Sequence, residues 1–240
     1  MCAEASVTPE KTPASNRLPE QLAPKEELDE VRRQLSAITP VSRETIERLE
    51  RYRQVLHRWQ AKTNLVSPDT LAQFWTRHVA DSLQVLPLSP EASTWIDLGS
   101  GGGFPGLVLA IANRGRNSRH ILIESSQKKC AFLREAARLA GAEVQVVNDR
   151  IESAAERIGE SLETGPVVTA RALAPLPQLL DWSAPSLQRG GLAIFHKGRE
   201  YAREVADCRG LWQFDMVNHQ SRIEPDSVLL EIRNPIRLTV

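Results

Sequence analysis

The chain has 240 residues, of which 41% are hydrophobic and 25% are charged, a composition typical of a globular protein with one good core. Thirty basic and thirty acidic side chains cancel, which excludes binding to nucleic acid through bulk charge but leaves room for a local basic patch. Three scattered cysteines without a C-x-x-C pair exclude both a disulfide framework and a thiolate zinc site.

Residues 1–24 carry four prolines among small and charged residues, and this composition predicts a flexible tail. The same segment has no apolar core of a secretory signal. No run in the chain approaches the roughly 18 apolar residues of a membrane span. With no disulfide framework either, we expect a cytoplasmic protein that does not bind a membrane.

Three helices are predicted in residues 25–92, ahead of any strand. The first covers residues 25–38, and Ser42 caps the second, whose apolar stripe includes Ile46, Leu49 and Leu56. The third follows "NLVSPD" as one helix that buries Phe74 and Val79 along its inner side. Trp59 and Trp75 fall on the same apolar faces and are assigned to the core rather than to a base-stacking platform. We interpret residues 25–92 as an N-terminal helical cap.

From residue 93 onward, apolar strands alternate with helical stretches. The strands are "TWIDL", "HILIE", "EVQVV", "VVTA" and "LAIFH", and the helices lie near residues 106–113, 127–140, 151–158 and 176–187. Such alternation predicts a mostly parallel α/β sheet with helices on both faces. Two further strand-like runs, "LWQFDMV" and "SVLLEIR", are expected to form an antiparallel C-terminal edge. Residues 93–240 are therefore predicted to form a Rossmann-like core.

The segment "WIDLGSGGGFPG" (95–106) contains two overlapping glycine patterns. The pattern G-x-G-x-x-G is typical of dinucleotide binding, whereas D-x-G-x-G-x-G, which begins at Asp97, also occurs in sites for S-adenosylmethionine. In an open α/β sheet both ligands bind beyond the carboxyl ends of the strands. Glycines let a ligand approach the backbone closely in either case. The patterns alone therefore indicate a nucleotide site without choosing the ligand.

Two residues favour the second pattern. Asp97 is an awkward neighbour for an anionic pyrophosphate but is compatible with the cationic parts of S-adenosylmethionine. Pro105 removes a backbone N–H from the segment that a pyrophosphate would use. Glu124, which ends the second strand, can accept hydrogen bonds from the two ribose hydroxyls of an adenosine group. Because both cofactors contain adenosine, Glu124 does not discriminate between them.

Several segments together resemble one known family, the RsmG (GidB) small-subunit ribosomal RNA methyltransferases. They are "NLVS" (64–67), "FWTRHVADSL" (74–83), "DLGSGGGFPGLVLAI" (97–111), "ESSQKKCAFLRE" (124–135), "ARALAPL" (170–176) and "HKG" (196–198). The resemblance implies a class I, S-adenosyl-L-methionine-dependent fold. It further implies methyl transfer to N7 of a guanine in the decoding region of 16S rRNA, either free or within a small-subunit particle.

The resemblance also implies roles for individual residues. Gly99 and Gly101 would line the methionine part of the cofactor, and Phe104 would lie against it at the far side of the loop. Glu124 would hold the ribose. Ile151 and Glu152 would flank the adenine, and Arg171 would lie near the methyl-transfer end. Phe104 departs from the family, because an aliphatic residue is more usual there.

The chemistry of N7 methylation is consistent with the absence of a nucleophilic cysteine, an N-P-P-[YF] loop and a metal site from the sequence. N7 of guanine carries a lone pair and no proton, so it can attack the methyl group in line without a general base. Positioning can supply roughly 7 to 11 kcal/mol of the barrier. A cytosine-C5 methyltransferase would need a nucleophilic cysteine, and Cys130 falls within a predicted helix. The N-P-P-[YF] loop of exocyclic-amine methyltransferases is absent, and the five histidines do not form a metal site.

Basic residues near the ends of the elements are candidates for RNA contacts: Arg77, His78, Arg150, Lys197 and, less directly, Arg171 and Arg199. The alternative is a solvated surface or an internal ion pair, such as Arg77 or His78 with Asp81 across one helical turn. Two other functions stay open. One is an NAD(P)-dependent oxidoreductase that uses the first glycine pattern. The other is a ribosome assembly factor that binds the cofactor without catalysis.

Overall fold

The computed structural model describes residues 22–239, in which seven strands form one sheet. The strands are β1 (Thr94–Leu98), β2 (Arg119–Glu124), β3 (Gln145–Asn148), β4 (Val167–Arg171), β5 (Leu192–Lys197), β6 (Trp212–Gln220) and β7 (Val228–Arg237). Their order across the sheet is β3-β2-β1-β4-β5-β7-β6, with β7 antiparallel to both β5 and β6. The other pairs are parallel. The predicted parallel sheet and its antiparallel C-terminal edge are confirmed.

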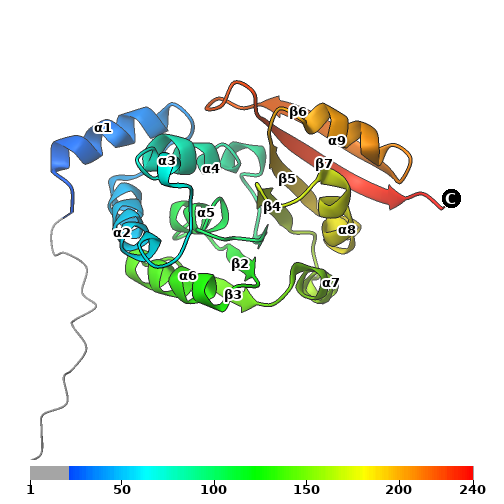
Figure 1. The fold of residues 1–240 in the computed structure, drawn as a ribbon, viewed down its shortest axis with the longest axis horizontal. Helices are drawn as coiled ribbons and strands as arrows, with labels where there is room; N and C mark the ends of the chain where they lie inside the picture. The colour runs from blue at the N-terminus through cyan, green and yellow to red at the C-terminus, as the bar shows by residue number, and fades with distance from the viewer. Residues whose placement is uncertain (1–21, 240) are drawn as a thin grey trace, which may run out of the picture.

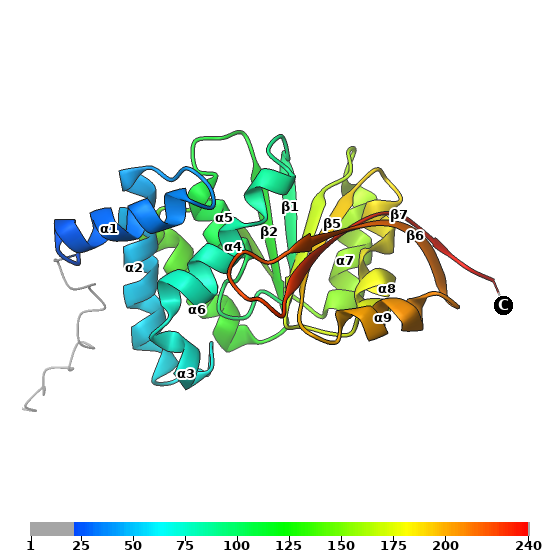
Figure 2. The same cartoon turned by 90° about the horizontal axis from the view of Figure 1, so that it is seen from above.

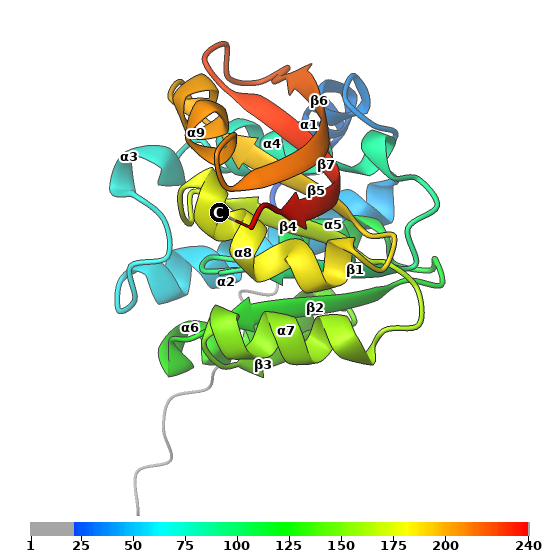
Figure 3. The ribbon, with the colours of Figure 1, turned by 90° about the vertical axis from the view of Figure 1, so that its right-hand side faces the viewer.

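Helices cover both faces of this sheet. They are α1 (Lys25–Ser36), α2 (Arg43–Gln60), α3 (Pro68–Leu71), η1 (Phe74–Ala80), α4 (Asp81–Leu83), η2 (Leu86–Leu88), α5 (Gly106–Ala112), α6 (Gln127–Ala140), α7 (Ile151–Ser161), α8 (Leu176–Leu187) and α9 (Tyr201–Cys208). Figure 2 shows α2, α5 and α6 on one side of the sheet and α7 and α8 on the other. Figure 3 shows the strands stacked from β3 at one edge to β6 at the other.

The N-terminal helices share a hydrophobic core with one face of the sheet. Leu49 and Tyr52 of α2 lie in the same buried cluster as Leu107 of α5 and Phe132 of α6. A second buried cluster joins α7 and α8 to the other face. Figure 1 shows α1 to α4 on the side of the molecule away from α7 and α8. The division into a cap and a core at residue 93 stays a prediction, since the same core runs through both parts.

The second helix begins as the sequence predicts. The Ser42 hydroxyl accepts a hydrogen bond from the Thr45 amide at 3.1 Å, which satisfies one of the free donors of the first turn. Trp59 and Trp75 pack against the core and Phe74 is buried, as expected. The tail predicted for residues 1–24 lies, up to residue 21, outside the described part of the chain.

The prediction of one continuous third helix is wrong. The short α3 ends at Leu71, and the chain then forms a π-helix, η1, before one turn of α-helix. The Asp81 amide donates to the Thr76 carbonyl, five residues back. These wider turns bury His78 and Asp81, and both side chains contact Arg171 at the end of β4. Among residues 22–239, the structure has no helix long and apolar enough to cross a membrane.

Candidate functional site

Two loops begin side by side at the centre of the sheet, where the end of β1 lies next to the end of β4. The chain leaves β1 toward β2 on one side and leaves β4 toward β5 on the other, so the loops diverge and open a crevice. The glycine segment 99–106 follows β1, and residues 172–175 follow β4. Both chemically informative parts of the sequence therefore lie at one topological switch point.

The glycine loop depends on backbone conformations that other residues rarely adopt. Gly99, Gly101 and Gly103 have φ angles of +63°, +51° and +93°. The Gly101 amide donates to Oε2 of Glu124 at 2.9 Å, and the Ser126 amide donates to Oε1 of the same carboxylate at 2.8 Å. Each carboxylate oxygen keeps a free lone pair. Glu124 thus fixes the loop and can still accept hydrogen bonds from two hydroxyl groups.

Asp97 lies beneath the loop rather than on its surface. Its side chain is 2% exposed, and Oδ1 accepts a hydrogen bond from the Thr169 hydroxyl at 2.8 Å. Burial raises the pKa of this carboxyl to about 6, against the lowering effect of its hydrogen bonds. Gly106 lets α5 approach β1, because a Cβ there would come within 2.6 Å of Asp97. Asp97 therefore supports the loop from below.

Phe104 points from the loop toward the N-terminal helices. Its ring stacks on the His78 imidazole with 4.5 Å between the centroids, and the Arg171 guanidinium lies 5.0 Å from its centroid. Tyr52 packs against the same ring and donates a hydrogen bond from its hydroxyl to the Gly102 carbonyl. Phe104 thus joins the glycine loop to η1 and to the end of β4.

The residues predicted to flank adenine lie past the end of β3. Ile151 and Glu152 begin α7, with Ile151 half-buried against the core and Glu152 exposed. Arg150 precedes them and is exposed. Glu124 ends β2, and β3 is the next strand in the sheet, so these residues follow the strand beside Glu124. With Arg171 at the end of β4, the predicted cofactor residues lie at the ends of four neighbouring strands, β3, β2, β1 and β4.

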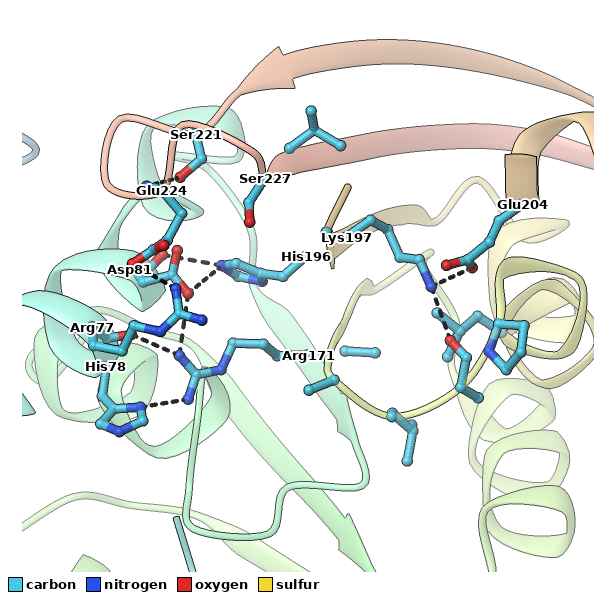
Figure 4. A pocket seen from close by; sticks show the side chains of 18 of the residues that line it. Arg77, His78, Asp81, Arg171, His196, Lys197, Glu204, Ser221, Glu224 and Ser227 are labelled. Carbon is cyan, nitrogen blue, oxygen red and sulfur yellow. Dashed lines mark hydrogen bonds and ion pairs between the residues drawn. The ribbon is translucent and has the colours of Figure 1, made fainter. Parts of the chain in front are cut away.

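A separate cavity of about 570 Å³ lies beyond the ends of β4 and β5 (Figure 4). Its polar and charged lining comprises Thr70, Arg77, His78, Asp81, Arg171, His196, Lys197, Glu204, Ser221, Glu224 and Ser227. Four of the predicted basic residues meet here, namely Arg77, His78, Arg171 and Lys197. Arg150 and Arg199 do not line this cavity.

Arg171 is the centre of the cavity's left-hand wall in Figure 4. Its guanidinium donates to Oδ2 of Asp81 at 3.1 Å and to the Arg77 carbonyl at 3.0 Å. Asp81 also receives the Gln84 amide on Oδ1 at 3.0 Å. The sequence alternative that paired Asp81 with Arg77 or His78 is therefore wrong. The π-turns of η1 aim Asp81 at β4, and Arg77 pairs instead with Glu224 at 2.5 Å.

The two histidines of this wall are held neutral. Arg171 donates to Nδ1 of His78 at 2.8 Å, so the His78 proton sits on Nε2, which is 3.1 Å from the Thr70 hydroxyl. Burial and the charge of Arg171 lower the pKa of His78 to about 4. His196 donates from Nε2 to the Asp81 carbonyl at 3.0 Å, and burial lowers its pKa as well.

Lys197 lies on the opposite wall and is 8% exposed. Its ammonium group donates to the Ala174 carbonyl at 3.0 Å and pairs with Oε2 of Glu204 at 2.5 Å. The neighbouring Arg199 pairs with Asp226 at 2.6 Å on the exposed surface. Both predicted RNA contacts thus already have protein partners.

Asp81, His196 and Glu204 were not assigned to the site from the sequence. The first two stood inside motifs of the resemblance, "RHVADS" and "HKG", so a signal for them existed. No motif marked Glu204, because its place in the cavity depends on how α9 packs against α8. Within residues 22–239 no group of three or more histidine, cysteine or carboxylate side chains could hold a metal ion. Cys130 and Cys208 are free and buried.

Comparison with known proteins gives a family match and a fold match. The family model described as GidB, rRNA small subunit methyltransferase G, matches residues 45–226. The ribosomal RNA small subunit methyltransferase G of Methylorubrum populi is 48% identical over 199 residues, covering 82% of this chain and 92% of its own. The protein of the same name from Brucella ovis is 48% identical over 207 residues, covering 85% and 95%.

Among solved structures, an O-methyltransferase from Bacillus cereus in complex with SAH superposes with a TM-score of 0.56 at 14% identity. The match covers 87% of this chain and 99% of that one. At this identity the likeness shows a shared fold. It confirms the predicted Rossmann-like methyltransferase architecture.

Proposed function

The chain belongs to the rRNA small subunit methyltransferase G family, and from this premise we propose that it methylates N7 of a guanine in the decoding region of 16S rRNA. S-adenosyl-L-methionine would be the methyl donor. The acceptor would be the RNA itself or the RNA within a small-subunit particle, and the reaction would take place in the cytoplasm.

The glycine loop supports the cofactor part of this proposal. Gly101 has positive φ, and a Cβ there would meet only the Gly99 carbonyl, at 3.7 Å, so the space beside the loop is open to a ligand. Glu124 has acceptor capacity left for the two ribose hydroxyls. Gly99, Gly101 and Glu124 would hold the methionine and ribose parts, while Ile151 and Glu152 would flank the adenine. When bound, S-adenosylmethionine supplies a methyl group carried on a sulfonium.

The observation that carries the acceptor part is the position of the cavity. It opens beside the glycine loop at the same switch point, and Leu173 touches both, because it lines the cavity and lies over Gly99. A cavity of about 570 Å³ falls within the range typical of small-molecule sites and can admit one flipped-out base. Arg77 and Arg171 line it, each paired with a carboxylate, and the remaining N–H donors of their guanidinium groups would suit a guanine edge.

The protonation states in the cavity agree with a reaction that needs no general base. His78 and His196 are neutral, but Nδ1 of His78 is already the acceptor of Arg171. The Asp81 carboxylate is engaged by Arg171 and Gln84. His78 and Asp81 are thus committed to holding Arg171, so their task would be to position the base and to exclude water. N7 of guanine carries a lone pair and no proton, so it could react in such a site without a general base.

Two alternatives make different demands on the same loop. An NAD(P)-dependent oxidoreductase would bind NADH, whereas an assembly factor without catalysis would bind S-adenosylmethionine and the particle but transfer nothing. Calorimetric titration with S-adenosylmethionine, S-adenosylhomocysteine and NADH distinguishes the proposed methyltransferase from the oxidoreductase. Methyl transfer from labelled cofactor to unmodified small subunits distinguishes it from the assembly factor without catalysis. We expect binding of the first two compounds and transfer of label. Binding of NADH alone would contradict the proposal.

A further inference from the structure

A buried ion pair holds the segment that separates the glycine loop from the cavity. Lys197 ends β5 and Glu204 lies on α9, with their side chains 8% and 21% exposed. Lys197 donates to the Ala174 carbonyl at 3.0 Å, and Oε2 of Glu204 accepts the Leu176 amide at 2.6 Å. The two charges therefore hold the chain on both sides of Pro175, as Figure 4 shows for the Lys197 half.

The segment that they hold is strained and lies against the cofactor loop. Ala172 has a φ of +51°, in the left-handed region that non-glycine residues rarely adopt. Its neighbour Leu173 reaches over Gly99, where Leu173 Cδ1 would be 2.5 Å from an added Cβ. A strained conformation persists only when the surrounding contacts enforce it. Here Lys197, through the Ala174 carbonyl, and Glu204, through the Leu176 amide, supply polar contacts that hold this conformation.

We propose that Lys197 and Glu204 form a clamp that positions residues 172–175 between the cofactor loop and the acceptor cavity. Both are positioning residues, and Lys197 acts through the segment rather than through contact with RNA phosphate. The catalytic consequence rests on the proposed methyl transfer. The effect on the segment does not, because it exists without cofactor or RNA.

Charge distinguishes this clamp from direct binding of RNA. Lys197→Met removes a positive charge from the cavity, and Glu204→Gln removes a negative one. If Lys197 contacted phosphate, the two substitutions would change RNA affinity in opposite directions, and Lys197→Met would reduce the salt dependence of binding by about one unit. If the pair is a clamp, both substitutions release the same segment, and both lower kcat.

The experiment uses the full chain with each substitution, the double variant, and two controls. The controls Arg203→Met and Glu200→Gln remove one positive and one negative charge from exposed positions of the same region. We expect both single variants to lower kcat by about 10- to 100-fold at saturating cofactor and RNA, since misplacement by about 1 Å can cost that much. The double variant should be no worse than the worse single one. The salt slope of RNA binding should not change, and the controls should behave like the unaltered chain.

Hydrogen exchange of residues 171–176, measured on the protein alone, tests the clamp without any reaction. We expect faster amide exchange there in all three variants, with thermal unfolding shifted by only a few degrees. Unchanged exchange, or faster exchange with unchanged kcat, would overturn the proposal. So would opposite effects of the two single variants on RNA affinity. If the unaltered chain transfers no methyl group, the proposed function fails while the exchange result still decides the clamp.

Discussion

The glycine loop and the acceptor cavity lie side by side but are built in different ways. The loop consists of consecutive residues, 97–106, and its shape depends on positive φ angles and close backbone approach. The cavity depends on side chains far apart in the sequence, since Arg171 meets Asp81 and Arg77 meets Glu224. A steric change should therefore disable the loop, whereas removal of a charge should disable the cavity.

The largest effect is expected from added volume in the loop. Gly99→Val forces a β-branched residue to φ +63° and drives its side chain into Leu173. Strain of about 1 to 2 kcal/mol and overpacking of about 1 to 3 kcal/mol lower the stability of the folded chain. The loop can relieve them only by leaving the geometry that holds the cofactor, so we expect cofactor binding to be lost. Calorimetric titration with S-adenosylmethionine measures it.

Gly115→Val is the matched control for this substitution. Gly115 also has positive φ, at +85°, but an added Cβ would meet no atom within 4 Å. We expect the control to lose some stability and to bind the cofactor normally. Equal cofactor affinity in the two variants would show that the loop does not approach the ligand.

The next effect concerns the charge pair of the cavity. Asp81→Asn leaves the buried Arg171 guanidinium without its carboxylate, and breaking a buried pair typically costs about 3 to 5 kcal/mol. Because Asn has the same shape, we expect the low end of that range in chemical unfolding. Methyl transfer should fall by at least tenfold while cofactor affinity stays near normal. The exposed Asp69→Asn is the control, and an equal loss of cofactor affinity and activity in Asp81→Asn would contradict the separation of the two regions.

The pH dependence of stability sharpens the comparison further. The pKa of His78 is lowered to about 4, so the folded state stays neutral while the unfolded chain takes up a proton below about pH 6.5. The stability that depends on neutral His78 is present above pH 6.5 and is lost as the pH falls toward 4. We expect a loss of about 2 to 3 kcal/mol over this range that His78→Gln does not show.

His120 offers a comparison outside the cavity. It lies near the start of β2, stacked on Trp95, and burial alone lowers its pKa to about 4. His120→Gln should also remove part of the acid sensitivity of unfolding, but it should leave methyl transfer unchanged at every pH. A change in the pH profile of activity for His120→Gln would contradict the assignment of the reaction to the other end of the sheet.

The smallest effect concerns the support that α2 gives to the glycine loop. The Tyr52 hydroxyl donates to the Gly102 carbonyl and so ties α2 to the glycine loop. Tyr52→Phe removes one hydrogen bond, worth about 1 kcal/mol, and should weaken cofactor binding by up to tenfold. Tyr201→Phe is the control, because its hydroxyl accepts a hydrogen bond from Asn218 on an exposed surface. Identical cofactor affinity in both variants would show that α2 does not support the loop.

The difference between the regions also explains what the sequence could predict. Strand and helix periodicity, the Ser42 cap and the glycine pattern act over a few residues, so the fold and the loop were predictable. The π-helix was not, because its turns bury Asp81 only in return for a contact with Arg171 on a distant strand. The partner of Lys197 was equally hidden, since Glu204 reaches it through the packing of α9. Such pairings depend on tertiary contacts that no local pattern encodes.

The central claim is that this chain methylates N7 of a guanine in the decoding region of 16S rRNA. The most direct test incubates the protein with labelled S-adenosylmethionine and unmodified 16S rRNA, free and in small subunits, and maps the labelled base. We predict label at N7 of a single guanine in the decoding region. Label on a pyrimidine, or binding of the cofactor without any transfer, would contradict the account.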